Sequence, residues 1–199
     1  MKLPPLFALA AFAAFSVVPA AQAVVIVVTG TFSGANEVPA VPSAGTGEAR
    51  VTFDDVAHTL RVEATFSGLT GFTTAAHIHG PAAPGANAGV ITQTPSFVGF
   101  PLGVSAGTMD ATYDLTLASS YNASFLSANG GSVAAAEAAL GNILGSGMSY
   151  FNIHTTFRTG GEIRANLFTA PDAGSTAALF AGALALGLFF ARRRARSLA

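Results

Sequence analysis

Three of the four histidines in this 199-residue chain lie in two short segments whose spacing suits a common site. His77 and His79 flank Ile78, and His154 directly follows Ile153. On a β-strand, residues two apart point to the same face, so His77 and His79 would project together while Ile78 faces the opposite side. If the two segments form neighbouring strands, the three imidazoles converge.

Such a cluster has three interpretations. Neutral imidazole binds copper, zinc, iron or nickel, and three histidines with an open fourth position are typical of a catalytic or loosely held metal. His77, His79 and His154 would then be ligands of copper or zinc, and redox catalysis at that metal is a further alternative. The interpretation that the sequence favours is simpler: the three histidines hydrogen-bond neighbouring loops and stabilise the fold.

Two other groups of polar residues stand out. Glu162 and Arg164 alternate along one predicted strand, so they form either a polar pair beside the histidines or, as we expect, a salt bridge at an exposed strand edge. An exposed bridge of that kind contributes under about 1 kcal/mol. His58 closely follows Asp54 and Asp55 and is expected to be a solvated residue of a hairpin turn.

Several chemistries are excluded by what the sequence lacks. There is no cysteine, so disulfides, thiolate metal sites and cysteine catalysis are unavailable. The chain has no Gly-x-Ser-x-Gly motif and no phosphate-binding loop, and its Gly45-Thr46-Gly47 segment lacks the rest of a dinucleotide-binding motif. Serine hydrolases and nucleotide-dependent enzymes are therefore not expected.

Alternating β-branched and aromatic residues, separated by Gly, Pro, Asn and Asp, predict seven strands. These strands are expected at residues 25–33, 47–54, 59–67, 73–79, 107–117, 149–154 and 162–168. Residues 132–140 form a helix-favouring run with Ser132 as its N-cap, and Gly141 or Gly145 can end it. The pattern predicts an all-β domain, an immunoglobulin-like or Greek-key β-sandwich or barrel with one short crossover helix.

Charge and hydrophobicity divide the chain into three parts. Hydrophobic residues make up 51% of the sequence, and much of this excess lies at the two ends. Between the ends, residues 24–169 hold four arginines, no lysine and nine acidic residues, which gives a formal charge of −5. A domain this acidic should repel nucleic acid.

The first 23 residues are typical of a secretory signal peptide. Lys2 precedes an apolar core at residues 6–18, and Ala21-Gln22-Ala23 fits the small-x-small cleavage rule. An uncleaved anchor helix is the alternative, but the apolar core is short and small residues stand where the peptidase needs them. We therefore expect export by the Sec machinery, cleavage by signal peptidase after Ala23, and a mature chain that begins at Val24.

The last part of the chain, residues 170–199, has the features of a membrane-spanning tail. Residues 173–191 carry no charge, and at about 1.5 Å per residue they make about 28 Å of helix, close to the thickness of a bilayer core. The arginines that follow would stay on the cytoplasmic side of the inner membrane and leave the domain outside. A transmembrane helix is expected at about residues 174–191, followed by an arginine-rich end.

The segment Ala170-Pro171-Asp172-Ala173-Gly174 precedes this apolar stretch. With it, the tail resembles the PEP-CTERM class of bacterial sorting signals in its Val-Pro-Asp-Ser-Gly variant, although alanine replaces the valine and the serine. The resemblance implies an exosortase-type processing enzyme and release towards the cell surface or matrix. A permanent single-span anchor is the alternative.

Four separated motifs resemble, in order, those of the CHRD domain family. They are Gly34-Ala35-Asn36-Glu37-Val38-Pro39, Ala76-His77-Ile78-His79-Gly80-Pro81, Tyr150-Phe151-Asn152-Ile153-His154 and Gly160-Gly161-Glu162-Ile163-Arg164. The resemblance covers about residues 29–168, and we place the domain at residues 24–169. It implies an immunoglobulin-type β-barrel of exported bacterial proteins and no established reaction.

A weaker likeness is to copper–zinc superoxide dismutase, a Greek-key sandwich with a His-x-His strand and a later histidine. His77, His79 and His154 fall on its copper-ligand positions. This chain has no disulfide, and His58 alone cannot supply the bridging and zinc ligands, so no dinuclear site is expected. Fold analogy does not transfer function.

Together these patterns predict an exported bacterial protein whose domain is a non-catalytic binding or structural module outside the cytoplasm. Its implied partners are the export machinery, the processing enzymes and the inner membrane. The alternative is a copper- or zinc-binding protein with superoxide-dismutase-like redox activity.

Overall fold

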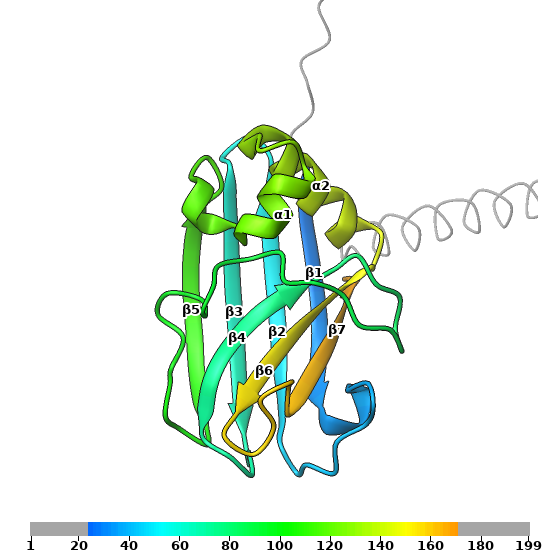
Figure 1. The fold of residues 1–199 in the computed structure, drawn as a ribbon, viewed down its shortest axis with the longest axis vertical. Helices are drawn as coiled ribbons and strands as arrows, with labels where there is room; N and C mark the ends of the chain where they lie inside the picture. Colours follow the sequence, from blue (N-terminus) through cyan, green and yellow to red (C-terminus); the bar gives the residue numbers. More distant parts are fainter. Residues whose placement is uncertain (1–23, 171–199) are drawn as a thin grey trace, which may run out of the picture.

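The computed structural model describes residues 24–170, and its strands follow the alternation of the sequence (Figure 1). The strands are β1 (Val25–Ser33), β2 (Thr46–Asp54), β3 (Thr59–Ser67), β4 (Thr73–His79), β5 (Gly107–Asp114), β6 (Ser149–Thr155) and β7 (Ile163–Thr169). The main departure is β5, which was expected to continue to residue 117. It ends at Asp114 because the Asp114 carboxylate accepts a hydrogen bond from the Thr116 amide at 2.8 Å and folds the chain into a turn.

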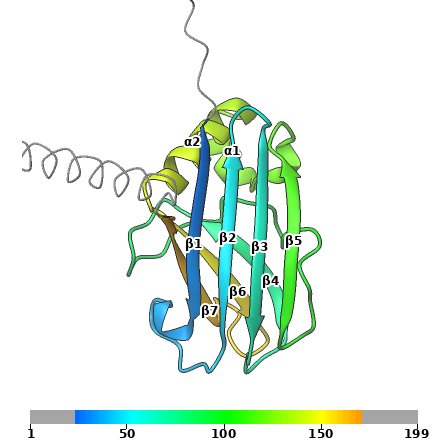
Figure 2. The same ribbon diagram turned by 180° about the vertical axis from the view of Figure 1, so that it is seen from behind.

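All seven strands belong to one antiparallel sheet in the order β4-β6-β7-β1-β2-β3-β5. The sheet curls into a half-barrel: β1, β2, β3 and β5 form one layer, and β4, β6 and β7 cross in front of it (Figures 1 and 2). The prediction of a mostly-β domain is confirmed. The strands form one curled sheet and not two separate sheets, because β7 pairs with both β6 and β1 and carries the hydrogen-bonding across the bend.

The core fills the space between the two layers. Phe32 of β1 and Phe151 of β6 are fully buried, with ring centroids 5.2 Å apart in an edge-to-face contact. Phe97, from the loop between β4 and β5, packs against the same Phe151 ring at 5.5 Å. Burying an aromatic side chain of this kind contributes about 1.5–3 kcal/mol, so these contacts hold the two halves of the sheet together.

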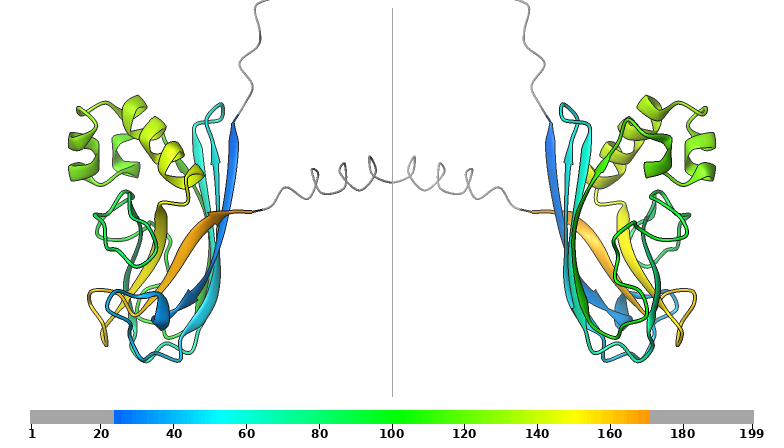
Figure 3. Two further views of the ribbon diagram at one scale, coloured as in Figure 1. Left: turned by 90° about the vertical axis from the view of Figure 1, so that its right-hand side faces the viewer. Right: turned by 90° about the vertical axis from the view of Figure 1, so that its left-hand side faces the viewer.

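Two helices connect β5 to β6 and lie at one end of the sheet (Figure 3). The predicted helix is present as α2 (Val133–Gly145), and the side chain of Ser132 caps it by accepting a hydrogen bond from the Ala135 amide. A second helix, α1 (Ala123–Ala128), was not predicted. Its main sequence signal is the N-cap Asn122, which accepts a hydrogen bond from the Ser124 amide at 2.8 Å.

The exposed-edge interpretation of Glu162 and Arg164 is wrong. The strand β7 lies between β6 and β1, in the interior of the sheet, and Glu162 and Arg164 are 0% and 2% exposed. Within residues 24–170 they form no ion pair with each other, since Arg164 pairs with Glu37 and Glu162 binds hydroxyl and amide groups.

His58 is exposed in the turn between β2 and β3, as expected, but it is also anchored. Its Nδ1 lies 2.9 Å from the carboxylate of Glu137 on α2. This contact raises the pKa of His58, first through the hydrogen bond and second through the charge of Glu137. The turn is thereby attached to the helix that covers the end of the sheet.

The predicted signal peptide (residues 1–23) and transmembrane helix (about 174–191) lie outside the described residues. Among residues 24–170, no helix is both long and apolar enough to cross a membrane.

Candidate three-histidine site

The predicted convergence of the histidines is confirmed. The strands β4 and β6 are neighbours, and their register places His77 opposite Asn152 and His154 opposite Ala75. The ring centroids of His77 and His154 are 5.1 Å apart, and the ring of His79 lies 5.8 and 6.0 Å from these two. One nitrogen from each ring can be chosen so that all three lie within 4.8 Å of one another. We call His77, His79 and His154 the three-histidine site.

The period-2 pattern explains this arrangement. Ile78 and Ile153 are fully buried in the core, so the residues on either side of them must point to the outer face of β4 and β6. His77 and His79 are nevertheless only 7% and 8% exposed, because the loop that follows β4 folds back over this face.

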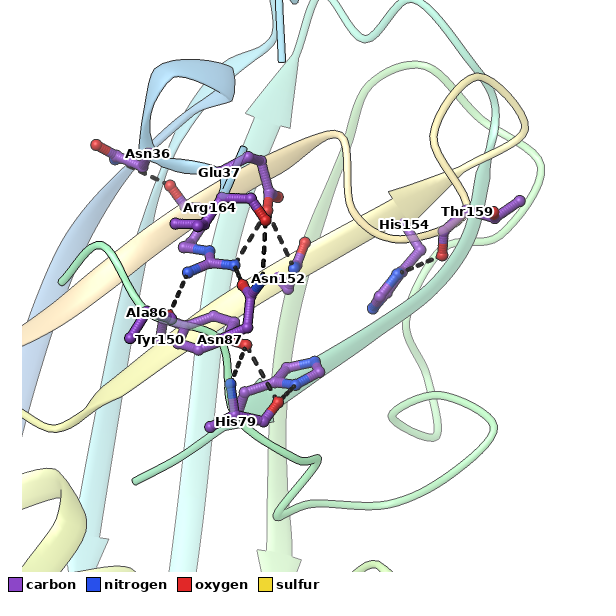
Figure 4. A network of polar contacts seen from close by, with 12 residues as sticks. Asn36, Glu37, His79, Ala86, Asn87, Tyr150, Asn152, His154, Thr159 and Arg164 are labelled. Atoms are coloured by element: carbon purple, nitrogen blue, oxygen red, sulfur yellow. Dashed lines mark hydrogen bonds and ion pairs between the residues drawn. The ribbon is translucent and has the colours of Figure 1, made fainter. Parts of the chain in front are cut away.

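Each histidine has one ring nitrogen held by a backbone carbonyl. Nε2 of His77 lies 2.7 Å from the oxygen of Pro95, and Nδ1 of His79 lies 3.0 Å from the oxygen of Ala88. Nδ1 of His154 lies 2.9 Å from the oxygen of Thr159 (Figure 4). A carbonyl oxygen only accepts hydrogen bonds, so each of these three nitrogens carries the proton.

The carbonyls that orient the rings belong to well-anchored loops. The Phe97 amide donates to the Ala76 carbonyl, and the Ala76 amide donates to Ser96 Oγ at 3.0 Å, so the segment that contains Pro95 lies along the free edge of β4. The loop after β6 is closed by hydrogen bonds from the amides of Thr155 and Gly161 to the carbonyl of Arg158. The orientation of the rings is thus part of the fold.

Burial keeps the three rings neutral. Burial lowers the pKa of His79 to about 4 and also lowers the pKa values of His77 and His154, while the bonds to the carbonyls only partly oppose this effect. Neutral imidazoles are the form that can bind a metal ion through the nitrogen opposite the N–H group.

A buried arginine network lies beside the three-histidine site (Figure 4). We define it as Glu37, Asn87, Tyr150, Asn152 and Arg164. The Arg164 guanidinium lies 3.3 Å from the Glu37 carboxylate and 3.8 Å from the centre of the Tyr150 ring, and it also donates to Asn87. The Tyr150 ring stacks on His79, with centroids 4.8 Å apart and planes 7° from parallel. The network therefore supports one face of the site.

Within the network, the pKa of Glu37 is subject to opposing influences. Burial raises the pKa of Glu37, and the charge of Arg164 and the hydrogen bonds from Arg164 and Asn152 oppose that rise. Gly161 lies directly against this pair: its φ is +128°, and a Cβ there would collide with Asn152 and Glu37. The position therefore needs glycine for both space and backbone conformation.

Glu162 forms a separate buried anchor. Its carboxylate accepts hydrogen bonds from the hydroxyls of Ser43 and Thr155, both at 2.6 Å, and from the amides of Thr70 and Gly71. Burial raises the pKa of Glu162, but these four bonds outweigh burial and leave it below its ordinary value. One side chain therefore ties two loops to the end of β6.

The four sequence motifs meet in these two clusters. Asn36 donates to the carbonyl of Arg164, Glu37 pairs with its guanidinium, and the segments with His79 and Tyr150 complete the contacts.

A family model for the CHRD domain matches residues 28–167 of the chain. The chain belongs to the CHRD domain family. Neither the curated proteins nor the solved structures contain a significant match to the chain.

Sequence reasoning missed the partners within the CHRD domain. It placed Arg164 beside Glu162, two residues away, whereas the structure pairs Arg164 with Glu37 from the other end of the domain. The available signal was the pair of motifs themselves: Glu37 and Arg164 are charged residues in segments otherwise rich in glycine and apolar residues. Charged groups in such segments are buried only when they are paired.

Proposed function

We propose that this CHRD protein is a non-catalytic binding or structural module that acts outside the cytoplasm. The match to the CHRD family over residues 28–167 carries the proposal, because that family indicates a non-enzymatic role. The domain's architecture supports it, since its buried charged residues are engaged in holding loops, strands and a helix together; they are Glu37, Glu137, Glu162 and Arg164.

Delivery is the second part of the proposal. Residues 1–23 direct the chain into the Sec machinery and are removed by signal peptidase. Residues 170–199 then halt the chain in the inner membrane, with the domain outside, until an exosortase-type enzyme processes the tail and releases the protein towards the cell surface. The domain's formal charge of −5 fits a role that does not involve nucleic acid.

Removing the tail tests this route. Deletion of residues 177–199 should release soluble domain into the periplasm or the medium, because the uncharged stretch and the arginines would be gone. Immunoblots of membrane, periplasmic and medium fractions measure the outcome. Deletion of residues 195–199 alone is the control, since it keeps the apolar stretch and three arginines, and it should leave the location unchanged. An unchanged location after the long deletion would contradict the proposal.

A turnover assay tests the non-catalytic role. The purified protein, loaded with copper or zinc, should remove superoxide no faster than the same amount of metal bound to an unrelated histidine-containing peptide. Turnover above that background, if lost in a His77→Ala/His79→Ala variant, would favour the redox alternative.

A further inference from the structure

A count of protons shows that His77 and His154 cannot satisfy all their contacts as neutral rings. Each ring faces a carbonyl acceptor, at Pro95 and Thr159, which together require two N–H groups. The remaining nitrogens, Nδ1 of His77 and Nε2 of His154, are 3.2 Å apart. A hydrogen bond between them needs a third proton, and two neutral imidazoles have only two. As neutral rings they therefore turn two nitrogen lone pairs towards each other, and a cation between them would relieve this repulsion.

A cation at this position would be either a proton or a metal ion, and the environment of His79 separates these two possibilities. A shared proton satisfies only two nitrogens. His79 is more than nine-tenths buried, its Nδ1 is held by Ala88, and its Nε2 has no hydrogen-bond partner among residues 24–170. A third buried nitrogen lone pair in the same cluster is costly unless a cation or a hydrogen-bond donor engages it, and a single metal ion can engage all three.

The spacing of two of the three donor nitrogens also fits metal coordination, and the His79 ring would have to move closer, because the three nitrogens lie only within 4.8 Å of one another. Metal–imidazole bonds are about 2.0–2.1 Å long, so two nitrogens on one tetrahedral ion lie about 3.3 Å apart. The 3.2 Å between His77 Nδ1 and His154 Nε2 is close to that value. The carbonyl on the opposite nitrogen of each ring supplies the outer-shell hydrogen bond that orients a metal-bound histidine.

We propose that His77, His79 and His154 bind one copper ion through His77 Nδ1, His79 Nε2 and His154 Nε2. The inference does not depend on export or sorting, and it adds a ligand to the module. Copper is favoured over zinc for two reasons. Copper binds nitrogen sites most tightly among the divalent first-row metals. In addition, all three donors are uncharged and the nearby Glu37 and Arg164 neutralise each other, so the site adds no negative charge and suits a monovalent Cu(I) ion.

Copper titration of the full-length chain tests the site. The protein is purified in mild detergent without a histidine tag and titrated separately with Cu(I), Cu(II) and Zn(II) in competition with a coloured chelator. We expect one copper per chain and displacement of zinc by copper. His77→Ala and His79→Gln should each weaken copper binding by more than the 10- to 100-fold typical of losing an outer-shell partner.

His58→Asn is the matched control. It removes the fourth histidine, which lies in the turn between β2 and β3, and asparagine tolerates the positive φ of 52° found there. Copper affinity should be unchanged in this variant. Equal weakening in His58→Asn and His77→Ala, or no stoichiometric binding by the unaltered chain, would overturn the site. Tighter binding of zinc than of copper would overturn the assignment of the ion.

A measurement on the unaltered protein covers the case in which a variant fails to fold. X-ray absorption of the copper-loaded chain should show a first shell of nitrogen near 2.0 Å, with the outer-shell scattering of about three imidazoles. A spectrum with oxygen ligands and one imidazole or none would contradict the proposal.

Discussion

At the scale of single residues, Arg164 is notable because its charged side chain is almost completely buried. Its guanidinium is buried, and it contacts Glu37, Asn87, Tyr150 and the carbonyl of Ala86. A buried ion pair contributes little by itself because desolvation offsets the attraction. Removing one partner strongly lowers the stability of the fold, because it leaves the other charge buried and unpaired.

We therefore expect Arg164→Met to lower the free energy of unfolding by about 3–5 kcal/mol. Arg61→Met is the matched control: Arg61 pairs with Asp110 at 2.7 Å on the surface, and its loss should lower the free energy of unfolding far less. Urea unfolding followed by circular dichroism gives both values. Adding Glu37→Gln to Arg164→Met should recover part of the loss, and similar losses in the two arginine variants would contradict this account.

At the scale of elements, Glu162 connects segments that are distant in the chain. It lies immediately before β7 and binds Ser43 ahead of β2, Thr70 and Gly71 between β3 and β4, and Thr155 at the end of β6. Loops usually contribute little stability of their own. A single carboxylate with four donors fixes these loops at the end of the sheet opposite the helices (Figure 1).

The lowered pKa of Glu162 makes this anchor dependent on pH. Because its folded pKa is below its ordinary value of 4.5, its stabilising effect is present above about pH 4.5 and is lost as the pH falls through the folded pKa. Glu162→Gln should lower the free energy of unfolding at pH 7 by about 1–3 kcal/mol, since an amide cannot accept all four bonds. Chemical unfolding between pH 3 and 7 should then show a flatter pH dependence in the variant.

Glu48→Gln, on the exposed face of β2, is the control for this experiment. It should change neither the stability at pH 7 nor the pH dependence appreciably. A Glu162→Gln variant with the pH dependence of the unaltered protein would show that Glu162 is not the acid-sensitive anchor.

At the scale of the whole molecule, the domain is one curled sheet with its last strand in the interior. β7 is the final element of residues 24–170, yet it pairs with both β6 and β1. The chain must therefore reach nearly the end of the domain before the half-barrel can form. This order gives the domain many contacts between distant residues, which is typical of slowly folding β proteins.

The exported protein should begin at Val24, one residue before β1. Cleavage after Ala23 would leave the strand intact, and the Val24 amide donates to the Asp55 carboxylate at 2.8 Å. Mass spectrometry of the secreted or membrane-bound protein measures the N-terminus. Ala21→Leu should block cleavage because the site requires small residues. Retention of Met1 in the unaltered exported protein would refute the signal peptide.

The sequence alone determined the strands and the direction of the histidines. Alternation is a local property: the need to bury Ile78 and Ile153 sends the neighbouring histidines to the other face, whatever the rest of the chain does. The seven strands and the capped helix α2 could be predicted for the same reason, because propensity and capping act between residues close in sequence.

Only the tertiary structure decided which segments meet. Three contacts depend on how the whole sheet curls to bury its core: β4 pairs with β6, β7 lies in the interior of the sheet, and Arg164 lies against Glu37. The backbone carbonyls that set the proton positions of the histidines come from loops without a distinctive sequence pattern. They belong to Pro95, Ala88 and Thr159. Contacts between distant residues are selected by packing of the complete domain, so no local pattern of the chain encodes them.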